Sequence, residues 1–275
     1  LQAPRPAQKL VHIHPGAEEL GRVYAADLML QAANASAAKA LEALAAPVSL
    51  PWAAQAAAAR AEYEANLVAP AIEPLDLAQV IKTLQRRLPE DTLYTNGAGN
   101  FAGWLHRYCR HPGLQHHGRT QLAPSSGAMG YGLPAAVAAA LLQPARWVVN
   151  LAGDGDFLMN GQELATATGY GAKQLISLVV DNGSYGTIRM HQEREYPGRV
   201  SGSDLANPDF ALLARAYGWH SERVERTEQF EPALERWLAA ARPGLLHLKL
   251  DADVSTSRTT LGAIRAAALA RAAAR

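Results

Sequence analysis

Several features that mark specialised classes of protein are scarce or missing in this sequence. A single cysteine, Cys109, excludes an internal disulfide. No run of about 18 apolar residues is present to span a bilayer. Leu1 is not followed by the charged and apolar segments of a secretory signal. We therefore expect a cytoplasmic protein without membrane partners, and a chain that begins inside a longer one.

An excess of charge of one sign is also missing. The chain has 26 basic and 25 acidic residues, spread along its length, for a net charge of +1. Without a basic stripe, nucleic acid and anionic membrane surfaces are not expected as partners. Its 275 residues are 49% hydrophobic, which is enough to bury a large core. The composition points to an ordinary globular protein.

Two kinds of site are missing as well. His12 with His14, and His116 with His117, lack a third ligand at a recognisable spacing, so zinc is not expected. The stretch from Gly97 to Gly99 continues without the third glycine of a dinucleotide-binding fingerprint. A nucleotide-dependent oxidoreductase is therefore not favoured.

What is present is a regular alternation of helices and strands, which begins after a less regular part. Residues 1–46 start with a strand at 9–14 and a helical stretch from Ala17, and 47–74 is expected to be a linker. In the domain at 75–275 we expect helices at 75–88, 131–142, 160–170, 187–193, 209–217, 230–241 and 263–275, and strands at 92–95, 147–151, 175–180 and 245–250. Apolar strands separated by helices predict an α/β fold, with a doubly wound, mainly parallel sheet and helices on both faces.

Ligands of such sheets bind at the carboxyl ends of strands, and the residues found there suit a phosphate and a metal. The strand at 147–151 is followed by Gly153, Asp154, Gly155 and Asp156. Glycines allow close backbone approach to a diphosphate, and Asp154 could hold a divalent cation. Taken alone, such a tripeptide is more often a simple turn.

The next apolar strand, at 175–180, ends in further oxygen donors. It is followed by Asp181, Asn182, Gly183 and Ser184. Mg²⁺ prefers six hard oxygen ligands, and the Asp154 carboxylate, the Asn182 side-chain oxygen and the Ser184 backbone carbonyl could supply three. Two phosphate oxygens and one water would complete the shell. Asp181 can also be read as a turn former at the strand end.

The whole stretch GDGDFLMNGQELATATGYGAKQLISLVVDNGSYGTI resembles the signature of thiamine diphosphate enzymes of the acetolactate synthase, pyruvate oxidase and benzoylformate decarboxylase type. The resemblance implies that Gly153, Asp154, Gly155, Asp156, Asn182, Ser184, Tyr185, Gly186 and Thr187 contact the cofactor, and that Asp154, Asn182 and Ser184 bind the metal. Two departures are visible. Asp154 and Asn182 are one residue further apart than the family pattern, through an extra residue near Lys173 and Gln174, and Asp181 stands where the family often has asparagine.

A second segment, QLAPSSGAMGYGLP at 121–134, is similar to the family's segment that faces the middle of the cofactor. By this resemblance the Gly127 carbonyl accepts a hydrogen bond from the aminopyrimidine. Met129, preceded by Ala128, wedges between the two rings and keeps the cofactor bent. The alternative for Met129 is a gap-filling role in the core, which is common for methionine.

Other candidate residues carry weaker signals. Asn96, Gly97 and Ala98 follow the strand at 92–95 and form another wall of the expected diphosphate pocket, or only a glycine-rich loop. His191, on the helix that borders the substrate side, is a possible proton carrier or a surface residue. A tryptophan expected near this place in acetolactate synthases is absent. The segment 253–260 resembles a mobile C-terminal stretch of the family, and we assign it no role.

The resemblance implies an enzyme that uses thiamine diphosphate and Mg²⁺ to decarboxylate a 2-keto acid and join the product to a second carbonyl. Residues 1–46 resemble the closing strand and helix of the family's central domain, in which some members carry FAD; no flavin role is assigned here. The activating glutamate belongs to a first domain, and complete sites form in a homodimer or homotetramer, so this part alone is expected to be inactive. A simple decarboxylase, an acyl-transfer relative and a non-catalytic cofactor-binding module are the alternatives.

Overall fold

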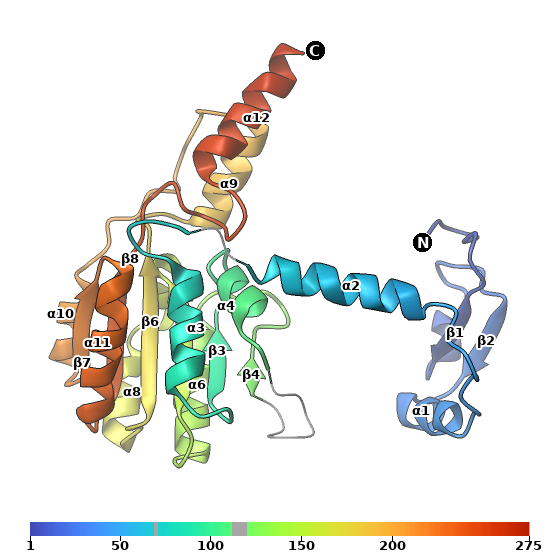
Figure 1. Cartoon of the computed structure of the whole chain (residues 1–275), viewed down its shortest axis with the longest axis horizontal. Coiled ribbons are helices and arrows are strands. Elements are labelled where there is room, and N and C mark those ends of the chain that lie inside the picture. Colours follow the sequence, from blue (N-terminus) through green and yellow to red (C-terminus); the bar gives the residue numbers. More distant parts are fainter. Residues whose placement is uncertain (69–70, 112–119, 275) are drawn as a thin grey trace. The chain divides into compact units, whose positions relative to one another are not determined.

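The computed structural model describes residues 1–68, 71–111 and 120–274, and these fall into two units (Figure 1). Unit 1 comprises Leu1–Tyr63 and unit 2 comprises Glu64–Arg275. His116 and His117, considered above as metal ligands, lie outside the described residues. The boundaries expected after residues 46 and 74 differ in detail from this division and stay predictions.

Unit 1 contains a pair of parallel strands and two helical segments. β1 (Val11–His14) pairs with β2 (Leu28–Gln31), and they are followed by α1 (Asn34–Glu42) and by α2 (Ala53–Asn66), which runs into unit 2. The helix expected from Ala17 is wrong, because only a short 3-10 turn, η1 (Ala17–Glu19), forms there. Gly21 has a φ of 77°, which is incompatible with a continuing helix, and the apolar residues that follow it form β2 instead.

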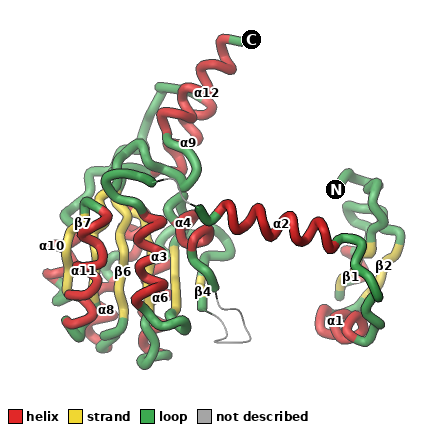
Figure 2. Tube along the Cα trace, viewed as in Figure 1, coloured by secondary structure: helices red, strands yellow, loops and turns green. Residues whose placement is uncertain are grey.

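Unit 2 is built on a six-stranded parallel sheet with the strand order β4-β3-β5-β6-β8-β7 (Figure 2). The strands are β3 (Leu93–Asn96), β4 (Gln121–Leu122), β5 (Val148–Gly153), β6 (Leu175–Asp181), β7 (His220–Val224) and β8 (Gly244–Lys249). The prediction of a doubly wound α/β sheet is confirmed. β4 and β7 lie at the two edges of the sheet and were not predicted.

Helices cover both faces of this sheet. On one face lie α3 (Leu77–Arg87), α4 (Ala102–Tyr108) and α11 (Thr227–Ala239). On the other lie α6 (Gly132–Leu142), α7 (Asp154–Asn160), α8 (Glu163–Tyr170) and α10 (Phe210–Ala216). The single helix expected at 160–170 is therefore in part wrong, because α7 already begins directly at the end of β5.

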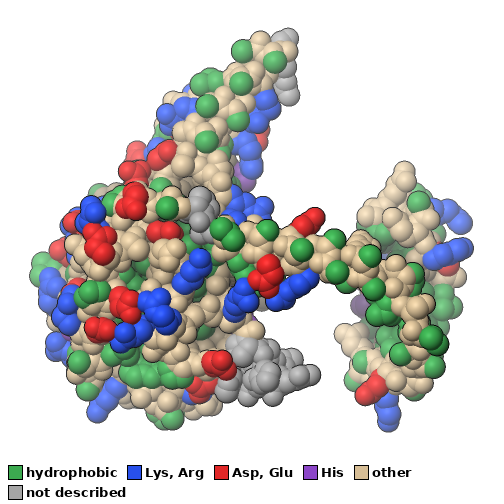
Figure 3. Space-filling model, in the orientation of Figure 1, with side chains coloured by type: hydrophobic (Ala, Val, Ile, Leu, Met, Phe, Trp, Pro, Cys, Tyr) green, Lys and Arg blue, Asp and Glu red, His purple; other side chains and the backbone are tan. Residues whose placement is uncertain are grey.

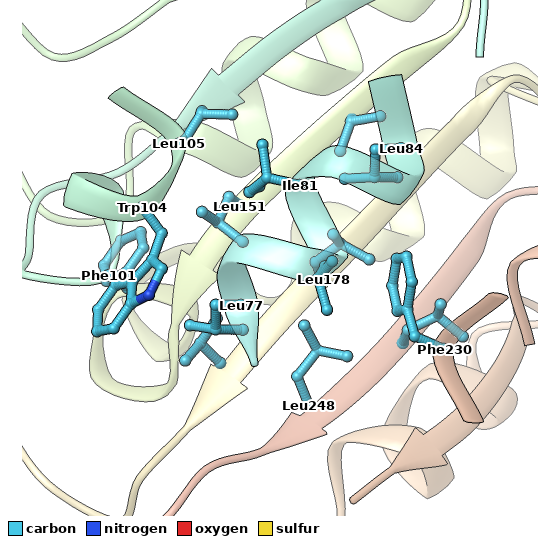
Figure 4. Packing of buried hydrophobic residues seen from close by; sticks show 14 of the residues in the cluster. Leu77, Ile81, Leu84, Phe101, Trp104, Leu105, Leu151, Leu178, Phe230 and Leu248 are labelled. Atoms are coloured by element: carbon cyan, nitrogen blue, oxygen red, sulfur yellow. The ribbon is translucent and has the colours of Figure 1, made fainter. Parts of the chain in front are cut away.

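The period-two alternation of the central strand sorts its side chains into two cores. Ile176, Leu178 and Val180 of β6 belong to the cluster beneath α3 and α11, whereas Leu175 and Val179 belong to the opposite cluster. All five are buried, as expected for a strand with helices on both sides. Figure 4 shows Leu178 and Leu248 packed beside Leu77, Ile81 and Phe230.

A row of hydrogen-bonded polar side chains crosses three neighbouring strands, β3, β5 and β6. The Thr95 hydroxyl lies 3.2 Å from Asn150 Oδ1, and Asn150 Nδ2 donates to Ser177 Oγ at 2.8 Å. The three residues are paired across β3, β5 and β6 and have no exposed surface. Thr95 Oγ1 also donates to the Gly132 carbonyl at 2.9 Å, which brings the start of α6 to the end of β3. The buried polar groups are thus satisfied and hold this edge of the sheet in register.

The C-terminal helix lies beside the helix that follows β6. Figure 1 shows α9 (Gly186–Glu195) next to α12 (Leu261–Ala273), and the two are in contact. Between them Glu193 has no exposed surface, and its carboxylate accepts a hydrogen bond from Arg265 Nε at 2.7 Å and one from the Gly198 amide at 2.9 Å. A buried charge needs such partners, so this ion pair fixes α12 against α9.

The surface of unit 2 carries charges of both signs. In Figure 3, Lys and Arg side chains are interspersed with Asp and Glu side chains over the face in view. Arg87 pairs with Glu235 at 2.8 Å and Arg236 pairs with Glu222 at 2.6 Å. Among the described residues, no helix combines the length and apolar character needed to cross a membrane.

The sheet core gives a first test. Leu178→Ala should lower the free energy of unfolding by about 2–5 kcal/mol, because it opens a cavity among fully buried side chains. Leu212→Ala is the control, since this leucine on α10 is 60% exposed and should change stability little. Urea unfolding of both variants measures the difference. Equal losses would contradict the packing described here.

Candidate functional site

A cavity of about 250 Å³ lies at the carboxyl ends of the central strands. The segments that follow β3, β5, β6 and β8 all contribute to its wall. Most residues predicted to bind the cofactor line this one cavity: Ala98, Gly127, Met129, Gly153, Asp154, Gly155, Asp156, Asn182, Ser184, Tyr185, Gly186 and Thr187. The structure therefore brings them together, while their individual roles stay predictions.

The pairing of β5 with β6 brings the two oxygen-rich segments together. Gly153 at the end of β5 is paired with Val180 near the end of β6. Asp154 is the first residue after β5, and Asn182 is the first residue after β6. The two therefore leave the sheet at the same edge, as expected for parallel strands. The Gly183 amide donates to Asp154 Oδ2 at 2.9 Å, which links the two segments directly.

Asp154 is buried, with 3% of its surface exposed. Its Oδ1 accepts the Gly155 amide at 2.9 Å, and its Oδ2 accepts the Gly183 amide and the Asn207 side-chain amide at 2.9 and 2.8 Å. Burial raises the pKa of this carboxyl above its ordinary value, the nearby Asp181 carboxylate adds to the rise, and the hydrogen bonds oppose it. A bound cation would favour the charged form.

The other two predicted metal ligands, Asn182 and Ser184, lie on the same cavity wall. Asn182 Oδ1 accepts hydrogen bonds from the Ser184 amide and hydroxyl, both at 3.2 Å. Among the described residues, no group of three or more His, Cys, Asp or Glu side chains could hold a metal. A site made from one carboxylate, one amide oxygen and one carbonyl fits Mg²⁺ only if a ligand such as a diphosphate supplies further oxygens.

Asp156 ties three loops of the site together. Its Oδ1 accepts the Gly130 amide at 2.7 Å and the Ala98 amide at 3.2 Å. Burial raises the pKa of this carboxyl to about 6, against the effect of the two hydrogen bonds. A Cβ at Gly97 would lie 1.9 Å from Asp156 Oδ1, so only glycine fits beside this carboxylate. The carboxylate thus contacts the protein's own backbone amides.

Met129 lines the cavity and is 39% exposed, which argues against the alternative that it fills the core. Its loop is held by Asn160, whose Nδ2 donates to the Gly130 carbonyl at 2.9 Å. Gly127 has a φ of 68°, a left-handed conformation that favours glycine. Ala128, between the two, does not line this cavity.

Three other predicted residues also lie away from the cavity wall. Asn96 and Gly97 line an adjoining open groove of about 430 Å³ instead. Asn96 Oδ1 is 3.1 Å from His106 Nε2, so this side chain is engaged away from the cavity. His191 is exposed and lies against Arg194, whereas Ile188 of the same helix does line the cavity. The geometry thus gives no support to a proton-carrying role for His191.

The cavity wall contains residues that the sequence analysis missed: Gly99, Asn100, Phe101, Trp104, Val180, Leu250, Val254 and Ser255. The segment 253–260, to which the sequence alone assigns no role, follows the carboxyl end of β8, where the strand-end rule places ligands. Asn100 Nδ2 donates to Ser255 Oγ at 3.2 Å, and Ser255 Oγ donates to the Gly186 carbonyl at 3.0 Å. These bonds close the wall between the loops after β3, β6 and β8.

The raised pKa of Asp156 makes stability depend on pH. The pKa of the Asp156 carboxyl is about 6 in the folded protein and 3.8 in the reference state. The contribution of this group to the free energy of unfolding is therefore fully present below pH 3.8 and is lost as the pH rises through 6. Between pH 4 and 8, the free energy of unfolding of the metal-free wild type should fall by about 3 kcal/mol relative to that of Asp156→Asn. Urea unfolding of both proteins across this pH range measures the difference. Parallel pH profiles would contradict the assignment.

Comparison with known proteins agrees with this geometry. The family model for the C-terminal TPP binding domain of thiamine pyrophosphate enzymes matches residues 97–248. The chain is 37% identical over 175 residues to the acetolactate synthase isozyme 2 large subunit of Escherichia coli, covering 62% of this chain and 31% of that protein. It is 32% identical over 178 residues to a probable acetolactate synthase large subunit of Methanocaldococcus jannaschii, covering 64% and 29%. The chain spans less than a third of either relative. It belongs to the thiamine pyrophosphate enzyme family and contains the family's C-terminal TPP-binding domain.

Proposed function

We propose that this chain is the cofactor-binding part of a thiamine diphosphate- and Mg²⁺-dependent enzyme that decarboxylates a 2-keto acid and ligates the product to a second carbonyl. One observation carries the proposal. Asp154, Asn182 and Ser184 meet on the wall of a cavity that also contains Met129. The metal-binding and cofactor-bending segments expected from the sequence therefore share one site.

The oxygen donors fit the metal of such a cofactor. Asp154 Oδ1 accepts only the Gly155 amide among the described residues, so this carboxylate oxygen keeps a lone pair for a cation. The Asn182 amide oxygen and the Ser184 carbonyl would provide the other protein ligands. When bound, thiamine diphosphate supplies a carbon nucleophile and an electron sink for the loss of CO₂.

The rest of the wall has properties that suit decarboxylation. Phe101, Trp104, Val180, Leu250 and Val254 make a large part of it apolar. Such side chains exclude water and reduce the solvation of a charged carboxylate, which favours its loss as neutral CO₂. Met129 lines the same cavity and would keep the cofactor bent.

The proposal includes a partner. The described residues that line the cavity include two aspartates and no glutamate, so the activating glutamate would come from another domain. We therefore propose that complete sites form in a homodimer or homotetramer, and that this chain alone is inactive. We also propose a cytoplasmic location, supported by the single cysteine.

Removal of the charged ligand tests the metal assignment. In the complete protein, Asp154→Ala should weaken Mg²⁺-dependent binding of thiamine diphosphate by about 100-fold or more, because changes to residues that only hydrogen-bond a metal ligand already reach this range. Tryptophan fluorescence, to which Trp104 in the cavity wall contributes, reports binding. Asp91→Ala is the control, since Asp91 pairs with Arg146 ahead of β3. Unchanged affinity in Asp154→Ala would refute the assignment.

A product assay tests the reaction. The complete protein with thiamine diphosphate and Mg²⁺ should convert pyruvate, or a larger 2-keto acid, into CO₂ and a ligated 2-hydroxy ketone product such as acetolactate. CO₂ with free aldehyde would show a simple decarboxylase and contradict the ligation step. Cofactor binding without turnover on a panel of 2-keto acids would contradict the whole reaction and favour a non-catalytic module.

A further inference from the structure

Two buried carboxylates beside the cavity share the same hydrogen-bond donors. The Asn207 side-chain amide donates to Asp154 Oδ2 at 2.8 Å and to Asp181 Oδ1 at 2.9 Å. The Gly183 amide donates to the same two oxygens, both at 2.9 Å. Asp154 and Asp181 are 3% and 2% exposed. Like charges held this close in a buried place need donors between them, and these two N–H groups provide them.

The charge of Asp181 is balanced from the other side. Its Oδ2 is 2.8 Å from His247 Nε2 and 3.0 Å from Lys249 Nζ, both on β8. The pairing of β6 with β8 sets Lys249 directly opposite Asp181, so this contact follows from the sheet register. Asp154 has no such cation among its described partners, which are the amides of Gly155, Gly183 and Asn207.

The shared donors also determine how Asp154 is oriented. Oδ2 accepts two hydrogen bonds, which fixes the carboxylate in one orientation, whereas Oδ1 accepts only one from the described residues. Mg²⁺ demands near-ideal octahedral geometry, so the orientation of a carboxylate ligand matters for its affinity. The side-chain oxygen of Asn207, Oδ1, is buried and accepts no hydrogen bond from the described residues. Only the NH₂ end of this amide is satisfied, and it contacts the two carboxylates.

We propose that Asn207 is a positioning residue for the metal site. It couples Asp154 to the Asp181, His247 and Lys249 cluster, so that Asp154 Oδ2 is engaged by the protein and Oδ1 remains for the cation. Asn207 lies 53 residues after Asp154 in the sequence, between β6 and α10. The inference rests on the proposed function, because it assigns Asn207 to the same metal site.

Metal affinity, measured directly, tests this role. In the complete protein with thiamine diphosphate, Asn207→Ala should weaken Mn²⁺ binding by about tenfold or more, the range found when residues behind metal ligands are removed. Electron paramagnetic resonance of free Mn²⁺ gives the affinity without any turnover. Asp209→Ala is the matched control, since this residue of the same segment caps α10 through the Leu212 amide at 2.9 Å. It should lower stability and leave Mn²⁺ affinity unchanged.

The outcomes separate this inference from the proposed function. Equal Mn²⁺ affinity in Asn207→Ala and wild type, or equal losses in Asn207→Ala and Asp209→Ala, would overturn the positioning role. If Asn207→Ala fails to fold, Asn207→Ser retains one donor for the two carboxylates, and its affinity should still fall; wild-type affinity would overturn the proposal. Asp154→Ala, measured alongside, tests the metal site itself: its failure to alter Mn²⁺ binding would reject the proposed function instead.

Discussion

The pairing of β5 with β6 is the constraint on which the site depends. Val148 to Gly153 lie opposite Leu175 to Val180 without a break, and both strands are buried on both faces. A slip of either strand by one residue would turn its side chains to the opposite face of the sheet and separate Asn150 from Ser177. Lys173 and Gln174, where the resemblance led us to expect an extra residue, lie between α8 and β6 and outside the paired strands. An insertion at this point would leave the strand ends level.

Once the strand ends are level, electrostatics distinguishes the two aspartates at the proposed metal site. Burial raises the pKa of Asp154. Burial acts in the same direction on Asp181, but hydrogen bonds from His247, Lys249 and Asn207 outweigh it and hold the pKa of Asp181 well below its ordinary value. Asp181 is thus a charge that the protein already compensates. Asp154 has only amide donors as partners among the described residues, which is the property expected of a ligand for the proposed cation.

Much of this arrangement could be predicted from sequence, because its signals are local. The strands at 147–151, 175–180 and 245–250 are mainly apolar, and the rule for strand ends led directly to Asp154 and Asn182. β7 was missed because four of its five residues are polar or charged, as suits an edge strand. Val254 and Ser255 follow the end of β8 and could have been found by the same rule. Asn207 was missed because its place depends on contacts with residues far along the chain, which no local pattern encodes.

The start of α7 explains how one short motif serves two different walls of the cavity. The helix begins at Asp154, so the side chains of Asp154 and Asp156 point about 200° apart around its axis. One therefore meets Gly183 and Asn207, and the other meets Ala98 and Gly130. Gly155 between them cannot be larger, since a Cβ there would lie 2.5 Å from the Tyr185 ring. Had a turn preceded the helix, as the sequence suggested, the two carboxylates would not be fixed to opposite walls. The immediate passage from strand to helix is what connects the loops after β3, β5 and β6 into a single site.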